Sequence, residues 1–159
     1  MQGKTVKETA LVFSHFVTPQ DANYYGNVHG GVIMRMIDDC GGVVAARHSH
    51  ANTVTASVDR IDFHNPAFIG EILTFKAALN FVGRTSMEVG VSVETENVMT
   101  GEKRHIASAY LTYVALDKER KPVEVPPVIP ETDVEKRRHE QAASRRELRL
   151  AEKKRERGD

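Results

Sequence analysis

The sequence predicts an α+β protein in which a curved antiparallel sheet of about five strands wraps around one long helix. Three observations carry this prediction. Residues 32–46 are almost entirely apolar, as in a helix packed against a sheet. Four later segments alternate apolar and polar residues, which is typical of strands with one buried and one solvated face. A charged segment after Pro130 predicts an additional C-terminal helix.

Length and composition set the class of protein. A chain of 159 residues with 40% apolar content suits one compact domain. No apolar run approaches the ~20 residues that span a bilayer, and no cleavable signal pattern precedes the domain, so we expect a soluble, cytoplasmic protein without a membrane partner. The formal net charge is zero, which argues against a nucleic-acid-binding protein. The lone cysteine, Cys40, argues against a disulfide or a cysteine-based metal site.

The N-terminal third predicts a strand, a loop and the long helix. Leu11, Phe13 and Val17 alternate within residues 5–17, which we interpret as the first strand. Residues 18–28 are rich in turn-forming Pro, Asp, Asn and Gly. The helix is expected to begin near His29, to continue for about 19 residues and to be buried.

The remaining strands follow in succession. The alternation changes phase near Asp59 or Arg60, which predicts a β-bulge there. Pro66 disfavours helix and central strand, so it marks a connection. A turn at Gly83 joins two alternating runs into a hairpin. The four segments are residues 52–63, 73–81, 87–93 and 107–115.

Four glycines lie at the start and in the middle of the helix: Gly30, Gly31, Gly41 and Gly42. Glycine inside a helix costs about 1 kcal/mol relative to alanine. We interpret them as sites of close backbone approach, with simple weakening of the helix as the alternative.

Prolines at positions 122, 126, 127 and 130 end the sheet domain, which we expect to occupy residues 1–125. Residues 126–159 would form a Pro-rich connection and a charged helix. Thr132 and Glu135 match a capping box at the start of this helix. With few apolar positions, the helix is expected to be solvated or loosely docked, and an arm that contacts a partner or RNA is the alternative.

Two adjacent aspartates in the apolar helix, Asp38 and Asp39, are the strongest functional signal in the sequence. A buried carboxylate is normally paired, neutralised or used in chemistry. Asp39 lies four residues after Arg35, which predicts an ordinary ion pair. Asp39 therefore has the simpler structural account, although Arg35 also lies three residues before Asp38.

Taken together, these residues resemble the hotdog-fold acyl-CoA thioesterases, specifically the broad-range acyl-CoA hydrolases. The resemblance covers roughly residues 6–123 and differs mainly at Glu71, where Asp is usual. The ordered motifs that carry it are Asp21-Ala22-Asn23, Gly26-Asn27-Val28-His29-Gly30-Gly31, Met36-Ile37-Asp38, Phe63 with Pro66 and Gly70, and Val82-Gly83-Arg84-Thr85-Ser86.

The resemblance implies hydrolysis of fatty acyl-CoA to free fatty acid and coenzyme A. Asp38 would assist the attacking water as a base, or act as a nucleophile through an anhydride. Asn23 would orient the water or the thioester, with Asn27 as the competing choice. The backbone N–H groups of Gly30 and Gly31 would stabilise the oxyanion. The nearby His29 could act as an acid but is more simply structural.

The resemblance also implies the ligands and the assembly. Arg84 and Ser86 are the first candidates to bind coenzyme A, and His64 with Asn65 are the second. No cofactor or metal is required, since coenzyme A enters as part of the substrate and leaves as product. A homodimer is expected as the minimal unit, and a hexamer formed as a trimer of dimers is the expected assembly.

Two alternatives stay open. The chain could bind acyl-CoA or an acyl carrier thioester without hydrolysing it, or it could dehydrate a hydroxyacyl chain. Dehydratases of this fold pair a histidine with a helix carboxylate, and His29 lies nine residues before Asp38. An interaction protein without chemistry ranks third.

Overall fold

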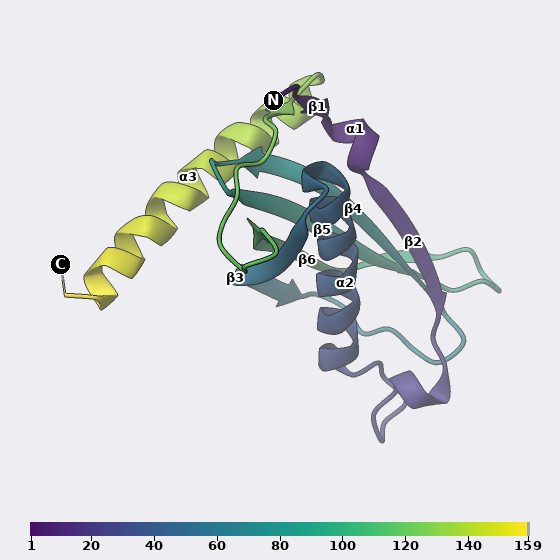
Figure 1. Ribbon diagram of the computed structural model, residues 1–159. Coiled ribbons are helices and arrows are strands. Elements are labelled where there is room, and N and C mark those ends of the chain that lie inside the picture. Colours follow the sequence, from purple (N-terminus) through teal and green to yellow (C-terminus); the bar gives the residue numbers. More distant parts are fainter. Residues whose placement is uncertain (159) are drawn as a thin grey trace.

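The computed structural model describes residues 1–158 and contains a five-stranded antiparallel sheet that curves around one helix, α2 (Gly30–Ser49) (Figure 1). The predicted α+β arrangement is therefore confirmed. The strand order across the sheet is β2-β4-β5-β6-β3. The strands are β2 (Leu11–Phe16), β3 (Asn52–Phe63), β4 (Ile72–Val82), β5 (Ser86–Glu96) and β6 (Lys103–Leu116).

The strand β3 lies at one edge of the sheet and, within residues 1–158, pairs with β6 alone. Its register shifts between Val58 and Arg60, which confirms the predicted bulge at Asp59. A second shift lies between Thr55 and Ser57 and was not expected. Bulges bend a strand and redirect its side chains, so these shifts affect which β3 side chains reach α2.

The first predicted strand is wrong over Val6–Thr9, which forms a short helix, α1, between β1 (Lys4–Thr5) and β2. A local cap explains the helix. The carboxylate of Glu8 accepts the backbone N–H of Thr5 at 2.6 Å and its hydroxyl at 3.0 Å, and this pairing outweighs the alternating pattern. A short helix, η1 (Pro19–Asp21), follows β2, and β1 pairs in parallel with β7 (Val128–Ile129).

The helix α2 buries one face, not all of its surface as predicted. Ile37 and Val44 are fully enclosed between the helix and the sheet. Met34 and Val43, on other sides of the helix, remain 47% and 41% exposed. A single sheet can cover only one side of a helix, which explains the difference. Within residues 1–158, no helix is both apolar enough and long enough to span a bilayer.

The glycine pattern has a physical cause at one position. A Cβ at Gly41 would collide with the hydroxyl of Tyr113 on β6, which confirms the predicted close approach there. At Gly42 the same ring would be 3.9 Å away, and at Gly31 the space is open, so close packing does not explain Gly31.

The C-terminal helix, α3 (Asp133–Glu156), begins with the predicted capping box: Glu135 N–H donates to the Thr132 hydroxyl at 3.1 Å. Most of the helix is solvated, as expected, but it is docked on the sheet by ion pairs that the sequence did not indicate. Arg145 forms two 2.9 Å bonds with Glu88 of β5, and the Glu88 side chain is only 2% exposed. Glu88 and Val89 point to opposite faces of the strand, so α3 covers the outer face while α2 covers the inner one.

Candidate active site

Asp38 lies on the flank of α2 that faces β3 and β6. Its Oδ1 accepts the hydroxyl of Thr55 at 2.7 Å and that of Tyr113 at 3.0 Å. Tyr113 also donates to the Asp38 backbone carbonyl at 2.9 Å. Within residues 1–158, Oδ2 has no hydrogen-bond donor. One carboxylate oxygen is therefore fixed, and the other is free to accept a proton from water.

Tyr113 acts only as a donor in this cluster. Burial raises the pKa of its phenol well above the usual range, and the negative charge of Asp38 raises this pKa further. The absence of a side chain at Gly41 leaves room for the phenol to reach Asp38. Neither Thr55 nor Tyr113 was identified from the sequence as a site residue, because each looks like an ordinary residue of an alternating strand.

Asp39 has no ion pair with Arg35, so the predicted pairing is wrong. Asp39 is exposed, and within residues 1–158 Arg35 has no ion-pair contact with either helix aspartate. An exposed pair gains little over hydration of the two charges, so nothing holds it in place. The two neighbouring carboxylates therefore differ: Asp38 is held by hydrogen bonds, whereas Asp39 is exposed.

Asn23 lies in the loop that precedes α2 and shapes that loop. Its Oδ1 accepts the backbone N–H groups of Tyr25 at 2.9 Å and Asn27 at 3.2 Å. The side-chain NH₂ donates no hydrogen bond within residues 1–158. The turn-forming role and a chemical role are thus compatible, because the turn uses the oxygen and leaves the amide donor available.

The start of α2 also offers free donors. His29 is the N-cap residue, and its side chain makes no capping bond. The N–H groups of Gly30 and Gly31 belong to the first turn, which has no intrahelical acceptors. Both glycines are exposed, and no Cβ blocks an approaching oxygen atom.

The candidate residues divide between the two ends of β4. His64 and Asn65 precede β4, and the Asn23 loop lies beside them, since Val28 N–H donates to Ala67 O at 2.9 Å. Arg84 and Ser86 follow β4, whose 11 residues span about 33 Å. One chain therefore does not bring its His64 and its Arg84 to the same ligand.

The second candidate pair for coenzyme A has neighbours that fix its direction. The His64 ring lies 5.2 Å from the ring of His105, and Asn65 Nδ2 donates to the His105 carbonyl at 2.8 Å. At the other end of β4, the Arg84 side chain is 76% exposed and lies 3.9 Å from Glu124. Arg84 is thus free to bind an anion in solution.

The site at Asp38 lies nearer the Arg84 end of the sheet. Thr55 pairs with Tyr113 across β3 and β6, and Ser86 pairs with Val114, the next residue of β6. The Asn23 loop lies at the opposite end, before the first turn of α2. Asp38 is eight residues after Gly30, about 12 Å along the helix axis. Within residues 1–158, no hydrogen bond joins Asn23 to Asp38.

An apolar groove of about 620 Å³ lies between β2 and the side of α2 that carries the partly exposed Val43. Val32, Met36 and Val43 line it from the helix, and Leu11 and Phe13 line it from β2. Such a surface is suited to an alkyl chain or to the apolar face of another chain.

Comparisons with known proteins agree with this architecture. Residues 25–102 match the family model of the thioesterase superfamily. The chain is 43% identical over 143 residues to the cytosolic acyl coenzyme A thioester hydrolase of Rattus norvegicus, covering 89% of this chain and 38% of that protein. The chain therefore spans well under half the length of this relative.

Solved structures match over almost the whole chain. The acyl-CoA hydrolase of Staphylococcus aureus, solved with butyryl coenzyme A, coenzyme A and coenzyme A disulfide, has a TM-score of 0.89 and 38% identity, covering 97% of this chain and 94% of that one. The same enzyme has been solved with an aspartate, an asparagine or a threonine replaced by alanine. An apo-hexameric acyl-CoA thioesterase has a TM-score of 0.92 and 37% identity, covering 96% of this chain and 97% of that one. The fold predicted by resemblance is thus confirmed, and this chain belongs to the acyl-CoA thioester hydrolases of the thioesterase superfamily.

Proposed function

We propose that this chain hydrolyses the thioester of fatty acyl-CoA to free fatty acid and coenzyme A, with Asp38 as the catalytic carboxylate. The observation that carries the proposal is the fixing of Asp38 Oδ1 by Thr55 and Tyr113, which leaves Oδ2 available for water. An oriented carboxylate that retains one free oxygen suits a general base.

The S. aureus variants support the choice of residues. In that enzyme, the replaced asparagine and aspartate are 15 residues apart, and the aspartate and threonine are 17 residues apart. Asn23, Asp38 and Thr55 have the same residue types at the same two separations. We therefore assign Thr55 to the site together with the two residues identified from the sequence.

The reaction follows from the positions of these groups. Asp38 accepts a proton from water while the water oxygen attacks the carbonyl carbon of the thioester. The Asn23 NH₂ orients the water or the thioester. The N–H groups of Gly30 and Gly31 donate to the oxyanion. The C–S bond then breaks, the thiolate of coenzyme A takes up the proton, and the carboxylic acid is released. In the alternative route, Asp38 attacks directly and water hydrolyses the resulting anhydride. Neither route requires a cofactor.

We place each site between two subunits. β3 is an exposed edge strand of 12 residues, and an edge of this length pairs readily with a second copy. A twofold axis across β3 would bring the Arg84 end of one subunit beside the Asn23 end of its partner. Each site would then combine residues from both subunits: Asp38, Arg84 and Ser86 from one, and Asn23, His64 and Asn65 from the other. The length of β4, about 33 Å, would then no longer keep the two groups of residues apart.

The wider assembly and location follow as further parts of the proposal. The hexameric thioesterase with 37% identity supports a trimer of dimers. The apolar groove along α2 is available for the acyl chain or for a subunit contact. The cytosolic rat relative supports a cytoplasmic location.

The test combines two strongly impaired variants. Asn23→Ala and Asp38→Ala are each expected to lower release of free thiol from acyl-CoA to a small residual rate. When they are co-refolded, each mixed dimer would carry one site with both defects and one with neither. Random mixing makes about half of the dimers mixed, so about a quarter of wild-type activity should return. No recovery, with mixed dimers confirmed by mass, would place both residues within one subunit.

The alternative functions give different results in the same assay. A binding protein would retain acyl-CoA without releasing thiol at any chain length. A dehydratase would change the absorbance of a hydroxyacyl thioester and leave the thioester intact. Either outcome with the wild-type chain would replace the hydrolase proposal.

A further inference from the structure

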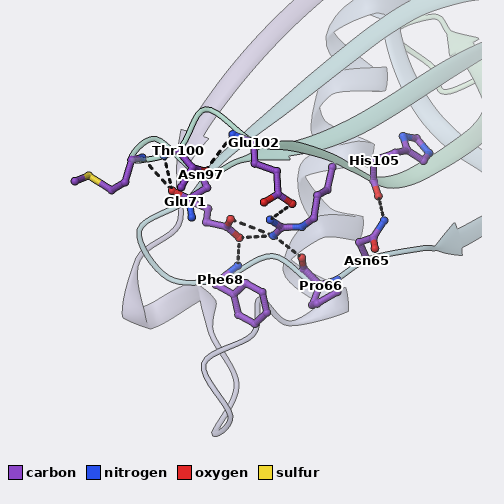
Figure 2. A network of polar contacts seen from close by, with 10 residues as sticks. Asn65, Pro66, Phe68, Glu71, Asn97, Thr100, Glu102 and His105 are labelled. Carbon is purple, nitrogen blue, oxygen red and sulfur yellow. Dashed lines mark hydrogen bonds and ion pairs between the residues drawn. The ribbon is translucent and has the colours of Figure 1, made fainter.

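A buried carboxylate, that of Glu71, organises the loop between β3 and β4, residues 64–71. The Glu71 side chain is 8% exposed and accepts the backbone N–H of Phe68 at 2.8 Å. Arg104 of β6 binds both of its oxygens, at 2.8 and 3.0 Å, and also donates to the carbonyl of Pro66 at 3.2 Å. Figure 2 shows Glu71, Phe68 and Pro66 of this network. The guanidinium lies 5.8 Å from the centre of the Phe68 ring.

These contacts connect the sheet to the loop by charged hydrogen bonds. Arg104 lies on β6, the strand that also carries Tyr113. The hydrogen bond to Glu71 raises the pKa of Arg104, so the cation persists at all working pH values. Hydrogen bonds between ionised partners are stronger than neutral ones, which makes this pair a firm anchor. The loop is thus fixed at both Pro66 and Phe68 from a rigid strand.

The anchored loop in turn holds the loop that carries Asn23. Phe68 forms a β-bridge with Asn27, and Val28 N–H donates to Ala67 O at 2.9 Å. The Asn27 carbonyl accepts a hydrogen bond from the backbone N–H of Asn23 at 2.7 Å, and the Asn27 N–H donates to Asn23 Oδ1 at 3.2 Å. Consecutive contacts therefore lead from Arg104 through Glu71 and Phe68 to the amide of Asn23.

We infer that Glu71 and Arg104 are positioning residues that set the direction of the Asn23 amide in the active site. This inference rests on the proposed catalytic role of Asn23. We assign Glu71 no contact with the reacting atoms, because its side chain is only 8% exposed and its oxygens bind Arg104 and Phe68 N–H. Its effect on turnover must therefore pass through the loop contacts.

The kinetic test compares Glu71→Gln with Glu102→Gln. Both glutamates face Arg104, but Glu102 is 62% exposed and 3.6 Å away, so its substitution is a matched control. Glu71→Gln is expected to lower kcat about tenfold, since small misplacements of reacting groups are costly, and Glu102→Gln is expected to keep wild-type kcat. In an Asn23→Ala background, Glu71→Gln should lower kcat no further. An equal loss in both backgrounds overturns the inference.

A second measurement separates this inference from the proposed function. Hydrogen exchange at the amides of Tyr25, Asn27 and Phe68 should accelerate in Glu71→Gln and stay unchanged in Glu102→Gln. Unchanged exchange in Glu71→Gln overturns the inference, even if the wild-type chain releases thiol. Accelerated exchange in a chain that releases no thiol refutes the hydrolase proposal and retains the anchoring.

Two further variants, Glu71→Asp and Arg104→Met, test the inference if Glu71→Gln does not fold. Glu71→Asp retains the charge with a shorter side chain, and the resembled family usually has Asp at this position. Glu71→Asp should keep most of the kcat, whereas Arg104→Met should lose it to the same extent as Glu71→Gln. Full activity in Arg104→Met would show that the ion pair has no part in positioning.

Discussion

The two long helices lie on opposite faces of one sheet and are held there by different forces. α2 presents Ile37, Val44 and other apolar side chains to the inner face, where they are fully buried. α3 lies on the outer face through Arg145 and Glu88, and Arg145 also stacks 3.7 Å from the centre of the Tyr110 ring. A second pair joins Arg149 to Asp59 of β3 at 2.8 Å.

Because α2 is held by apolar packing and α3 by ion pairs, charged residues have different roles on the two helices. Burying a large aliphatic side chain contributes about 1.5–3 kcal/mol, so the inner interface holds α2 without help from its charged residues. Asp38 is thereby free to serve a site. On the outer face the ionic groups hold the helix, because α3 buries little apolar surface, with Ala142 its one fully buried side chain within residues 1–158. We expect substitutions of charged residues to affect turnover on α2 and stability on α3.

The largest expected effect is on α2. Asp38→Asn should lower kcat by at least about a hundredfold, the typical contribution of a positioned base, with little change in Tm. Asp39→Asn is the matched control, because Asp39 is exposed, and it should retain activity. Thiol release measures kcat, and thermal unfolding measures Tm. Severe loss in Asp39→Asn with a mild effect in Asp38→Asn would reverse the assignment.

Truncating a buried residue of α2 tests whether apolar packing holds this helix on the sheet. Ile37→Ala removes a fully buried side chain, so the free energy of unfolding should fall by about 2–5 kcal/mol. Met34→Ala, at an exposed position of the same helix, should cost much less in the monomeric chain. Denaturant titration measures both variants. Equal losses would mean that Met34 is also buried in solution, in an interface between subunits.

The ionic side is tested by removing one partner and then both. Arg145→Met leaves Glu88 buried without its cation and should cost about 2–3 kcal/mol, less than for a fully buried pair because Arg145 is 23% exposed. The double variant Glu88→Met, Arg145→Met should recover most of this loss, since no buried charge remains. kcat should be unchanged in both. A loss of turnover in Arg145→Met would show that α3 also supports the site.

Deleting residues 131–159 extends the same comparison. Glu88 would then be hydrated and not stranded, so we expect a folded, active chain with a lowered Tm. A folded, active product would support the proposal that residues 1–125 form the thioesterase unit. Circular dichroism and thiol release measure the outcome, and an insoluble or inactive product would assign α3 to the essential core.

The smallest expected effect concerns the C-terminal end of α2. His48 is fully buried, and its Nε2 contacts Pro126 O at 2.6 Å. Burial lowers its pKa below the ordinary 6.5, so the unfolded chain binds the proton more readily and stability should fall as the pH drops below about 6.5. His48→Gln should flatten this dependence of Tm on pH. His50→Asn, at the exposed left-handed C-cap, should leave it unchanged.

The sequence by itself determined the elements whose cause is local or periodic. The alternation of apolar residues located β3, β4, β5 and β6, and the Thr132–Glu135 capping box located the start of α3. The phase change at Asp59 located a bulge because register and side-chain direction are coupled. The single helical turn at Val6–Thr9 escaped prediction because four residues are too few to show a period.

Only the tertiary structure decided what surrounds each polar group. The resemblance to a known family implied Asp38 over Asp39, yet no pattern in the sequence identified Thr55 and Tyr113. They are 17 and 75 positions away from Asp38, and the bulged register of β3 sets which side chains reach the helix. The sheet likewise has two faces, and composition alone did not show that α3 would bury Glu88 on the outer one. Periodicity reports how a residue relates to its neighbours in the chain, whereas burial and pairing depend on which distant segment covers it.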